Sequence, residues 1–122
     1  MENSGDAQTA MDFSRIQDTS DGDVEFEQEL FTVFLEDCEA RIGLLRAAIS
    51  SESLAPVHME AHTIKGAGAN VGTSKLHDIA ADIERLDAGA LAEKGSALFG
   101  ELETEFVRVK TAITDYLNKQ KA

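Results

Sequence analysis

From residue 24 onward, apolar residues recur at steps of three and four, which is the pattern of helices with one apolar face. Four helices are predicted, at about residues 24–49, 54–69, 74–88 and 91–118. The predicted buried positions are Phe31, Phe34, Cys38, Ile42, Leu45 and Ile49, then Leu54, Val57, Ala61, Ile64, Gly68 and Val71, then Leu76, Ile79, Ile83 and Leu86, and finally Leu98, Leu102, Phe106, Val109, Ile113 and Leu117. Short connections between such helices predict an all-α, antiparallel up-down four-helix bundle.

Local signals place the ends of these helices. The sequence DTSDGD at residues 18–23 is typical of a turn and a helix N-cap. Gly72 and Gly89 are predicted to end the second and third helices, and a break near residues 36–40 stays open. Residues 12–16 are predicted to form one turn of a short N-terminal helical extension. We therefore divide the chain into a flexible tail, residues 1–11, and a bundle, residues 12–122.

Length and composition fit a single helical domain. The 122 residues are 43% hydrophobic with few aromatic residues and one proline, and no strand pattern or internal repeat is evident. The net charge of -12 is concentrated in residues 1–29, which contain nine acidic residues and one basic residue, Arg15. Nucleic acid and polybasic membrane binding are therefore not expected, because both need clustered Lys and Arg.

The single cysteine and the apolar segments indicate the cell compartment. Cys38 cannot form an internal disulfide and lies on an apolar helix face, which fits a core position in a reducing compartment. No segment approaches the length of a membrane span, and the N-terminus is acidic where a signal peptide would be basic. We expect a cytoplasmic protein.

The segment from Ala61 to Gly72 holds the candidate chemistry. His62 follows a predicted core position by about 100° around the helix, which directs it to the flank or outside of the bundle. Lys65 and Gly66, three and four residues later, are its neighbours on the helix surface. An exposed imidazole is a nitrogen nucleophile, and a nearby ammonium group would stabilise a phosphoryl group attached to it. From the residues alone, however, a lone exposed histidine is more often inert than a phosphoacceptor, so the inert interpretation is favoured at this point.

Gly66 and Gly68 are unusual within a helix, where each costs about 1 kcal/mol relative to alanine. Close approach of another backbone would explain them, either from a neighbouring helix at Gly68 or from a partner protein at Gly66. A fraying helix end with incidental glycines would explain them as well. Spacing alone leaves both explanations open.

The segment resembles the signature of the histidine-containing phosphotransfer (HPt) family, which reads Ala-His-x-Leu-Lys-Gly, small residues, and Gly ten positions after the histidine. Here it reads AHTIKG at residues 61–66, small residues at 67–69, and Gly72. The likeness extends over about residues 12–118, through the Asp-Gly-Asp turn at 21–23, Phe-Leu-Glu at 34–36 and Ile-Glu at 83–84. Ala67 stands where Ser is frequent, and Ile64 replaces Leu.

The resemblance implies a role for several residues. His62 matches the phosphoacceptor, with Nε2 as the attacking atom, and Lys65 matches the residue that stabilises the phosphoryl group. Glu84 matches a position that hydrogen-bonds the other ring nitrogen. Gly66 matches the position kept small for docking of a receiver domain.

The resemblance also implies a phosphocarrier rather than an enzyme, which relays phosphoryl groups between receiver-domain aspartates in a two-component phosphorelay. Response-regulator receiver domains and a hybrid histidine kinase are the expected partners, and the receiver would supply Mg²⁺. We expect a monomer without a cofactor of its own. His58, Met59 and Ala69, on the same helix as His62, are expected to join Gly66 in partner docking.

Two other classes of function are weighed against the phosphocarrier. One is a bundle that docks to a kinase or receiver without phosphotransfer. The other is a metal-binding bundle, because His58 and His62 are four residues apart. Neither a zincin motif nor a third ligand is evident, so no metal is predicted.

Overall fold

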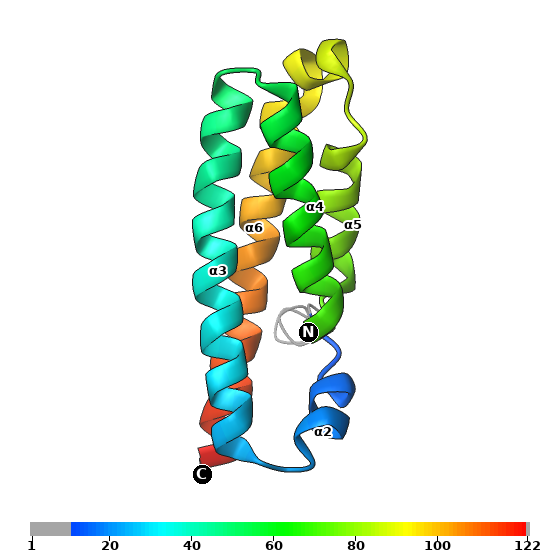
Figure 1. The fold of residues 1–122 in the computed structure, drawn as a ribbon. Coiled ribbons are helices and arrows are strands. Elements are labelled where there is room, and N and C mark those ends of the chain that lie inside the picture. Colours follow the sequence, from blue (N-terminus) through cyan, green and yellow to red (C-terminus); the bar gives the residue numbers. More distant parts are fainter. Residues whose placement is uncertain (1–10, 122) are drawn as a thin grey trace, which may run out of the picture.

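The computed structural model describes the backbone of residues 11–121 and the side chains of residues 11–120. In that part of the chain there are five α-helices and no strand: α2 (Ser14–Ser20), α3 (Val24–Ser50), α4 (Leu54–Val71), α5 (Ser74–Glu84) and α6 (Ala88–Lys121). The four longer helices alternate in direction, and α2 lies at the end of the bundle where α3 begins (Figure 1). The predicted fold class, an up-down four-helix bundle with a short N-terminal extension, is confirmed.

The core of the bundle follows the predicted apolar faces. Ala61 and Ile64 of α4 are fully inaccessible to solvent, as are Phe31 and Leu45 of α3, Leu76 and Ile83 of α5, and Leu102 and Val109 of α6. Leu54, Leu98 and Leu117, which were expected to be buried, are only partly buried against this core. Because Ala61 and Ile64 point inward, His62, which is about 100° around the helix from Ala61, is turned toward solvent.

Several of the predicted helix boundaries are wrong, including the start of the fourth helix, which begins at Ala88 rather than at Leu91. The third helix ends at Glu84 rather than at Gly89. The Asp87 side chain accepts a hydrogen bond from the backbone N–H of Ala90 and so caps α6, which therefore begins before Gly89. Gly89 thus lies in the first turn of α6. The N-terminal helix covers Ser14–Ser20 rather than residues 12–16. α4 continues to Val71, two residues beyond its predicted end. α3 runs through residues 36–40 without a break.

The segment before α2 packs against the lower part of the bundle in Figure 1. Met11, assigned above to the flexible tail, is buried in the core, whereas residues 1–10 of that tail lie outside the described residues. The Phe13 ring stacks on Tyr116 with 4.2 Å between the ring centroids. The Tyr116 hydroxyl donates to the buried Glu27 carboxylate at 2.8 Å, and the Ser20 hydroxyl donates to the same carboxylate. The folded body therefore includes Met11.

Two glycines near the end of α4 are required by their surroundings. Gly72 has a left-handed backbone (φ 87°), as expected for the residue that ends the helix, and its carbonyl accepts a hydrogen bond from the Asp12 N–H at 2.8 Å. A Cβ on Gly72 would collide with the backbone carbonyl oxygen of Asp12. A Cβ on Gly68 would lie 2.5 Å from the Thr73 hydroxyl oxygen, so close approach within the chain explains this glycine.

We expect Gly72→Ala to lower the free energy of unfolding by about 2 kcal/mol, because a left-handed conformation is strained for alanine and the added methyl group meets backbone. Urea denaturation followed by circular dichroism would measure the change. Gly100→Ala in α6 is the control, since its Cβ would meet no atom of the described residues within 4 Å. A Gly72→Ala protein as stable as the wild type would contradict the contact with Asp12.

The remaining general expectations concern Cys38 and the membrane. Cys38 is buried in the core as predicted, and burial, with a smaller effect of the Asp37 charge, raises the pKa of its thiol to about 12. Among residues 11–121, no helix is both long and apolar enough to cross a membrane.

Candidate functional site

His62 lies midway along α4 on the outside of the bundle. Its side chain is 67% exposed, whereas Ala61 and Ile64 on the same helix are buried. The helical rotation between these core residues fixes the direction of the imidazole, so the ring is presented to solvent by a rigid element rather than by a loop. The predicted exposure of His62 is confirmed.

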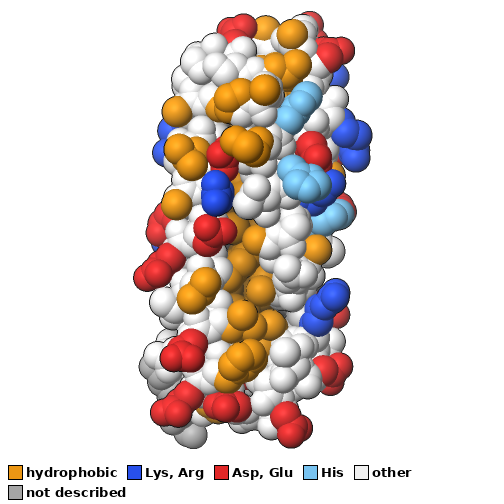
Figure 2. Space-filling model, in the orientation of Figure 1, with side chains coloured by type: hydrophobic (Ala, Val, Ile, Leu, Met, Phe, Trp, Pro, Cys, Tyr) orange, Lys and Arg blue, Asp and Glu red, His pale blue; other side chains and the backbone are white. Residues whose placement is uncertain are grey.

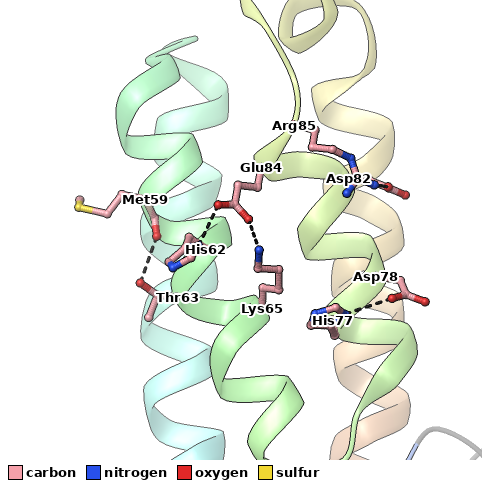
Figure 3. Close-up of polar contacts among 9 residues, drawn as sticks. All are labelled: Met59, His62, Thr63, Lys65, His77, Asp78, Asp82, Glu84 and Arg85. Carbon is pink, nitrogen blue, oxygen red and sulfur yellow. Dashed lines mark hydrogen bonds and ion pairs between the residues drawn. The ribbon is translucent and has the colours of Figure 1, made fainter.

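The last residue of α5 orients the His62 ring. Glu84 Oε2 lies 2.8 Å from His62 Nδ1, with the two side chains reaching toward each other between α4 and α5 (Figure 3). A carboxylate only accepts hydrogen bonds, so in this contact Nδ1 carries the proton. In the neutral imidazole the lone pair is then on Nε2, which no hydrogen bond from the described residues occupies. The ring is thus held in the tautomer in which Nε2 is the nucleophile.

Lys65 completes a group of three charged or titratable side chains. Its Nζ lies 2.7 Å from Oε1 of Glu84, so the two oxygens of one carboxylate bind Lys65 and His62 separately (Figure 3). The hydrogen bond from Lys65, and to a lesser extent the one from His62, holds the pKa of the Glu84 carboxyl below its usual range, although partial burial acts in the opposite direction. Glu84 is therefore ionised at neutral pH and holds both His62 and Lys65 in place.

The surface beside His62 has little side-chain bulk. Gly66 is exposed, and a Cβ built on it would meet no atom of the described residues within 4 Å. Ala69, one turn further along α4, is exposed as well. Met59 on the other side of His62 is 61% exposed. These three positions leave the approach to the ring open along the length of α4.

His58, predicted to lie at the docking rim, is held more firmly than expected. Its Nε2 lies 2.7 Å from the backbone carbonyl oxygen of Leu86, between α5 and α6, and the side chain is partly buried. Since a carbonyl only accepts, His58 Nε2 carries the proton in this contact. His58 therefore connects α4 to the α5–α6 connection, in addition to any role in docking.

The charges near the histidines differ from those at the lower end of the same face (Figure 2). All three histidines of the chain and several Lys and Arg side chains gather along one side of the face in Figure 2, whereas acidic side chains dominate its lower end. An apolar band runs beside the histidines. His77 in this group pairs with Asp78 at 3.1 Å, and Arg85 pairs with Asp82. On this face, the part that carries the histidines is thus less acidic than the lower end.

Comparison with known proteins agrees with this geometry. The family model described as "Hpt domain" matches residues 29–117. The chain belongs to the Hpt domain family. The crystal structure of histidine-containing phosphotransfer protein B (HptB) from Pseudomonas aeruginosa PAO1 is similar to this Hpt domain, with a TM-score of 0.80 and 22% sequence identity over 90% of this chain and 96% of that chain. A comparison with curated proteins found no match.

Membership of the family establishes the general function of this Hpt domain, which is histidine phosphotransfer in a two-component phosphorelay. Proteins of such relays are its partners, namely receiver domains and histidine kinases. Sequence reasoning singled out His62, Lys65 and Glu84, and the structure brings all three together. It missed the ion pair between Lys65 and Glu84 and the hydrogen bond of His58 to Leu86, because these contacts join residues 19 and 28 positions apart in the chain, with no local signal.

Proposed function

We propose that His62 of this Hpt domain accepts a phosphoryl group on Nε2 from the aspartyl phosphate of one receiver domain and passes it to the aspartate of another. The observation that carries this proposal is the exposed imidazole whose Nδ1 is engaged by Glu84 at 2.8 Å. A nucleophile in a relay must be reachable by two different proteins in turn, and a ring on the outside of a helix satisfies this requirement.

The transfer conserves atoms and charge. The Nε2 lone pair attacks phosphorus in line with the aspartyl oxygen, a P–N bond forms, and the P–O bond to the aspartate breaks with its electron pair leaving on the carboxylate. The proton on Nδ1 stays in place, and the positive charge that develops on the ring faces the Glu84 carboxylate. Transfer to the second receiver is the reverse of these steps.

The protein would act as a carrier and not as a complete enzyme. The Mg²⁺ that neutralises the phosphoryl group during transfer would be bound by the receiver, and this chain would supply the nucleophile, its orientation and the docking surface. Among the described residues, no three His, Cys, Asp or Glu side chains are grouped as a metal site would require. The absence of a bound metal stays a prediction, which calorimetry with zinc and iron salts would test.

The finer assignments rest on the surface near His62. Met59, Gly66 and Ala69 are exposed along α4 and are proposed to contact the receiver, with His58 at the edge of this contact. Lys65 is proposed to stabilise the phosphoryl group. A hybrid histidine kinase is proposed as the source of phosphate, with the protein acting as a cytoplasmic monomer.

The test is to incubate the protein with receiver domains carrying radiolabelled aspartyl phosphate and to score acid-labile, base-stable phosphate on it. This stability pattern identifies a phosphoramidate. We expect label on the protein within the time of mixing for at least one receiver of the same organism. If receivers bind the protein, as measured by calorimetry, but none transfers phosphate, the bundle is a docking module and the phosphocarrier assignment is wrong.

A further inference from the structure

The Glu84 carboxylate binds the two groups that the phosphorylated site needs most. One oxygen lies 2.8 Å from the ring nitrogen of His62 and the other lies 2.7 Å from Lys65 Nζ. Glu84 and Lys65 are both partly buried and His62 is exposed, so the ion pair is less accessible to solvent than the reactive ring beside it. Nothing in the predicted role of Lys65 accounts for this partner, because that role is to neutralise phosphate.

After phosphorylation, the single positive charge of Lys65 would be near two anions, the Glu84 carboxylate and the phosphoryl group on His62. A phosphoryl group on Nε2 would carry two negative charges, and Lys65 is one helical turn from His62. Its flexible four-carbon chain allows the ammonium group to move from the carboxylate toward the phosphoryl group. In doing so it would leave the Glu84 carboxylate beside a dianion with the His62 ring but without its ammonium partner, which is less favourable than the intact ion pair. The ion pair in the unphosphorylated protein therefore opposes phosphorylation.

We infer that Glu84 sets how tightly His62 holds its phosphoryl group by competing with that group for Lys65. The inference rests on the proposed phosphocarrier function of His62. Glu84 thus acts as a positioning residue in two ways: its hydrogen bond fixes the ring, and its ion pair keeps the phosphorylated state high enough in free energy for phosphate to leave. A carrier that bound phosphate too tightly would not pass it on.

The test separates the hydrogen bond from the charge. Glu84→Gln keeps an amide oxygen that accepts from Nδ1 but removes the charge that binds Lys65. We expect the equilibrium constant for phosphate transfer from the phosphorylated receiver to His62 to rise by about threefold to fivefold, as for the loss of a partly exposed ion pair. Lys65→Ala should lower it by a similar factor. In the Lys65→Ala background, Glu84→Gln should change the constant by less than about twofold, because the competition no longer exists.

Asp82→Asn is the matched control. Asp82 lies two residues before Glu84 on α5, and the substitution removes one negative charge and its ion pair with Arg85. The transfer constant should stay at the wild-type value. Nitrogen NMR of the His62 ring should show the proton on Nδ1 in both the wild type and Glu84→Gln. An unchanged or lower constant in Glu84→Gln, or an equal effect in both Lys65 backgrounds, would overturn the competition. Failure of the wild-type protein to accept phosphate would instead refute the proposed function, and the inference with it.

Discussion

The His62→Gln protein is expected to take up no phosphate from any phosphorylated receiver. Glutamine has similar length and can still hydrogen-bond Glu84, but its amide nitrogen has no basic lone pair and cannot attack phosphorus. Because the His62 side chain is largely exposed and makes one hydrogen bond, we expect the free energy of unfolding to change by less than about 0.5 kcal/mol. Radiolabel transfer on a gel and urea denaturation measure the two quantities on the same samples.

His77→Gln is the control for this experiment. His77 is also a surface histidine on the His62 side of the bundle, where it pairs with Asp78, but it has no contact with Glu84 or Lys65. This variant should be labelled like the wild type. Undiminished labelling of His62→Gln, or loss of label in His77→Gln instead, would show that the phosphoacceptor had been assigned to the wrong residue.

The fold could be predicted from sequence because its information is local. The three-four spacing of apolar residues defines the inward face of each helix, and the burial of Ala61 and Ile64 then determines that His62 faces outward. Helix ends were less predictable where two signals compete. Gly89 is a common stop signal, but the Asp87 side chain two residues earlier caps the next helix, and the cap decided where α6 begins.

The site could be predicted in part for the same reason. His62, Lys65 and Gly66 lie on consecutive turns of one helix, so their proximity follows from helical geometry. Glu84 comes from another helix, and only the family resemblance indicated its contact with the ring. Neither helical geometry nor the family resemblance predicted that Lys65 binds Glu84. This contact depends on how α4 and α5 are positioned relative to each other and on the rotamers of the two side chains. The contact that carries the further inference thus required the structure.

Gly66→Leu should reduce the rate constant of phosphotransfer from a receiver, expressed as kcat/KM, by about 100-fold while the protein stays folded. Transfer in line requires the receiver aspartate to come within bonding reach of Nε2, and a displacement of about 1 Å can cost 10²-fold in rate. Gly66 is one turn from His62 on the same face, and its Cβ would point into space free of other described residues. A leucine there therefore does not disturb the bundle but occupies the space that an incoming domain needs.

Gly100→Leu separates this steric effect from a general effect of leucine on the surface. Gly100 is also an exposed glycine within a helix with no described atom near its Cβ, but it lies on α6, beside Lys75 and Ile79 of α5 and not beside α4. Both variants gain helix propensity, by about 1 kcal/mol, so both should be at least as stable as the wild type. Only Gly66→Leu should lose phosphotransfer and receiver affinity, measured by stopped-flow quenching and calorimetry. Equal rates in the two variants would mean that the receiver reaches His62 without passing over Gly66, and the docking surface would then have to lie toward Met59 and the start of α4.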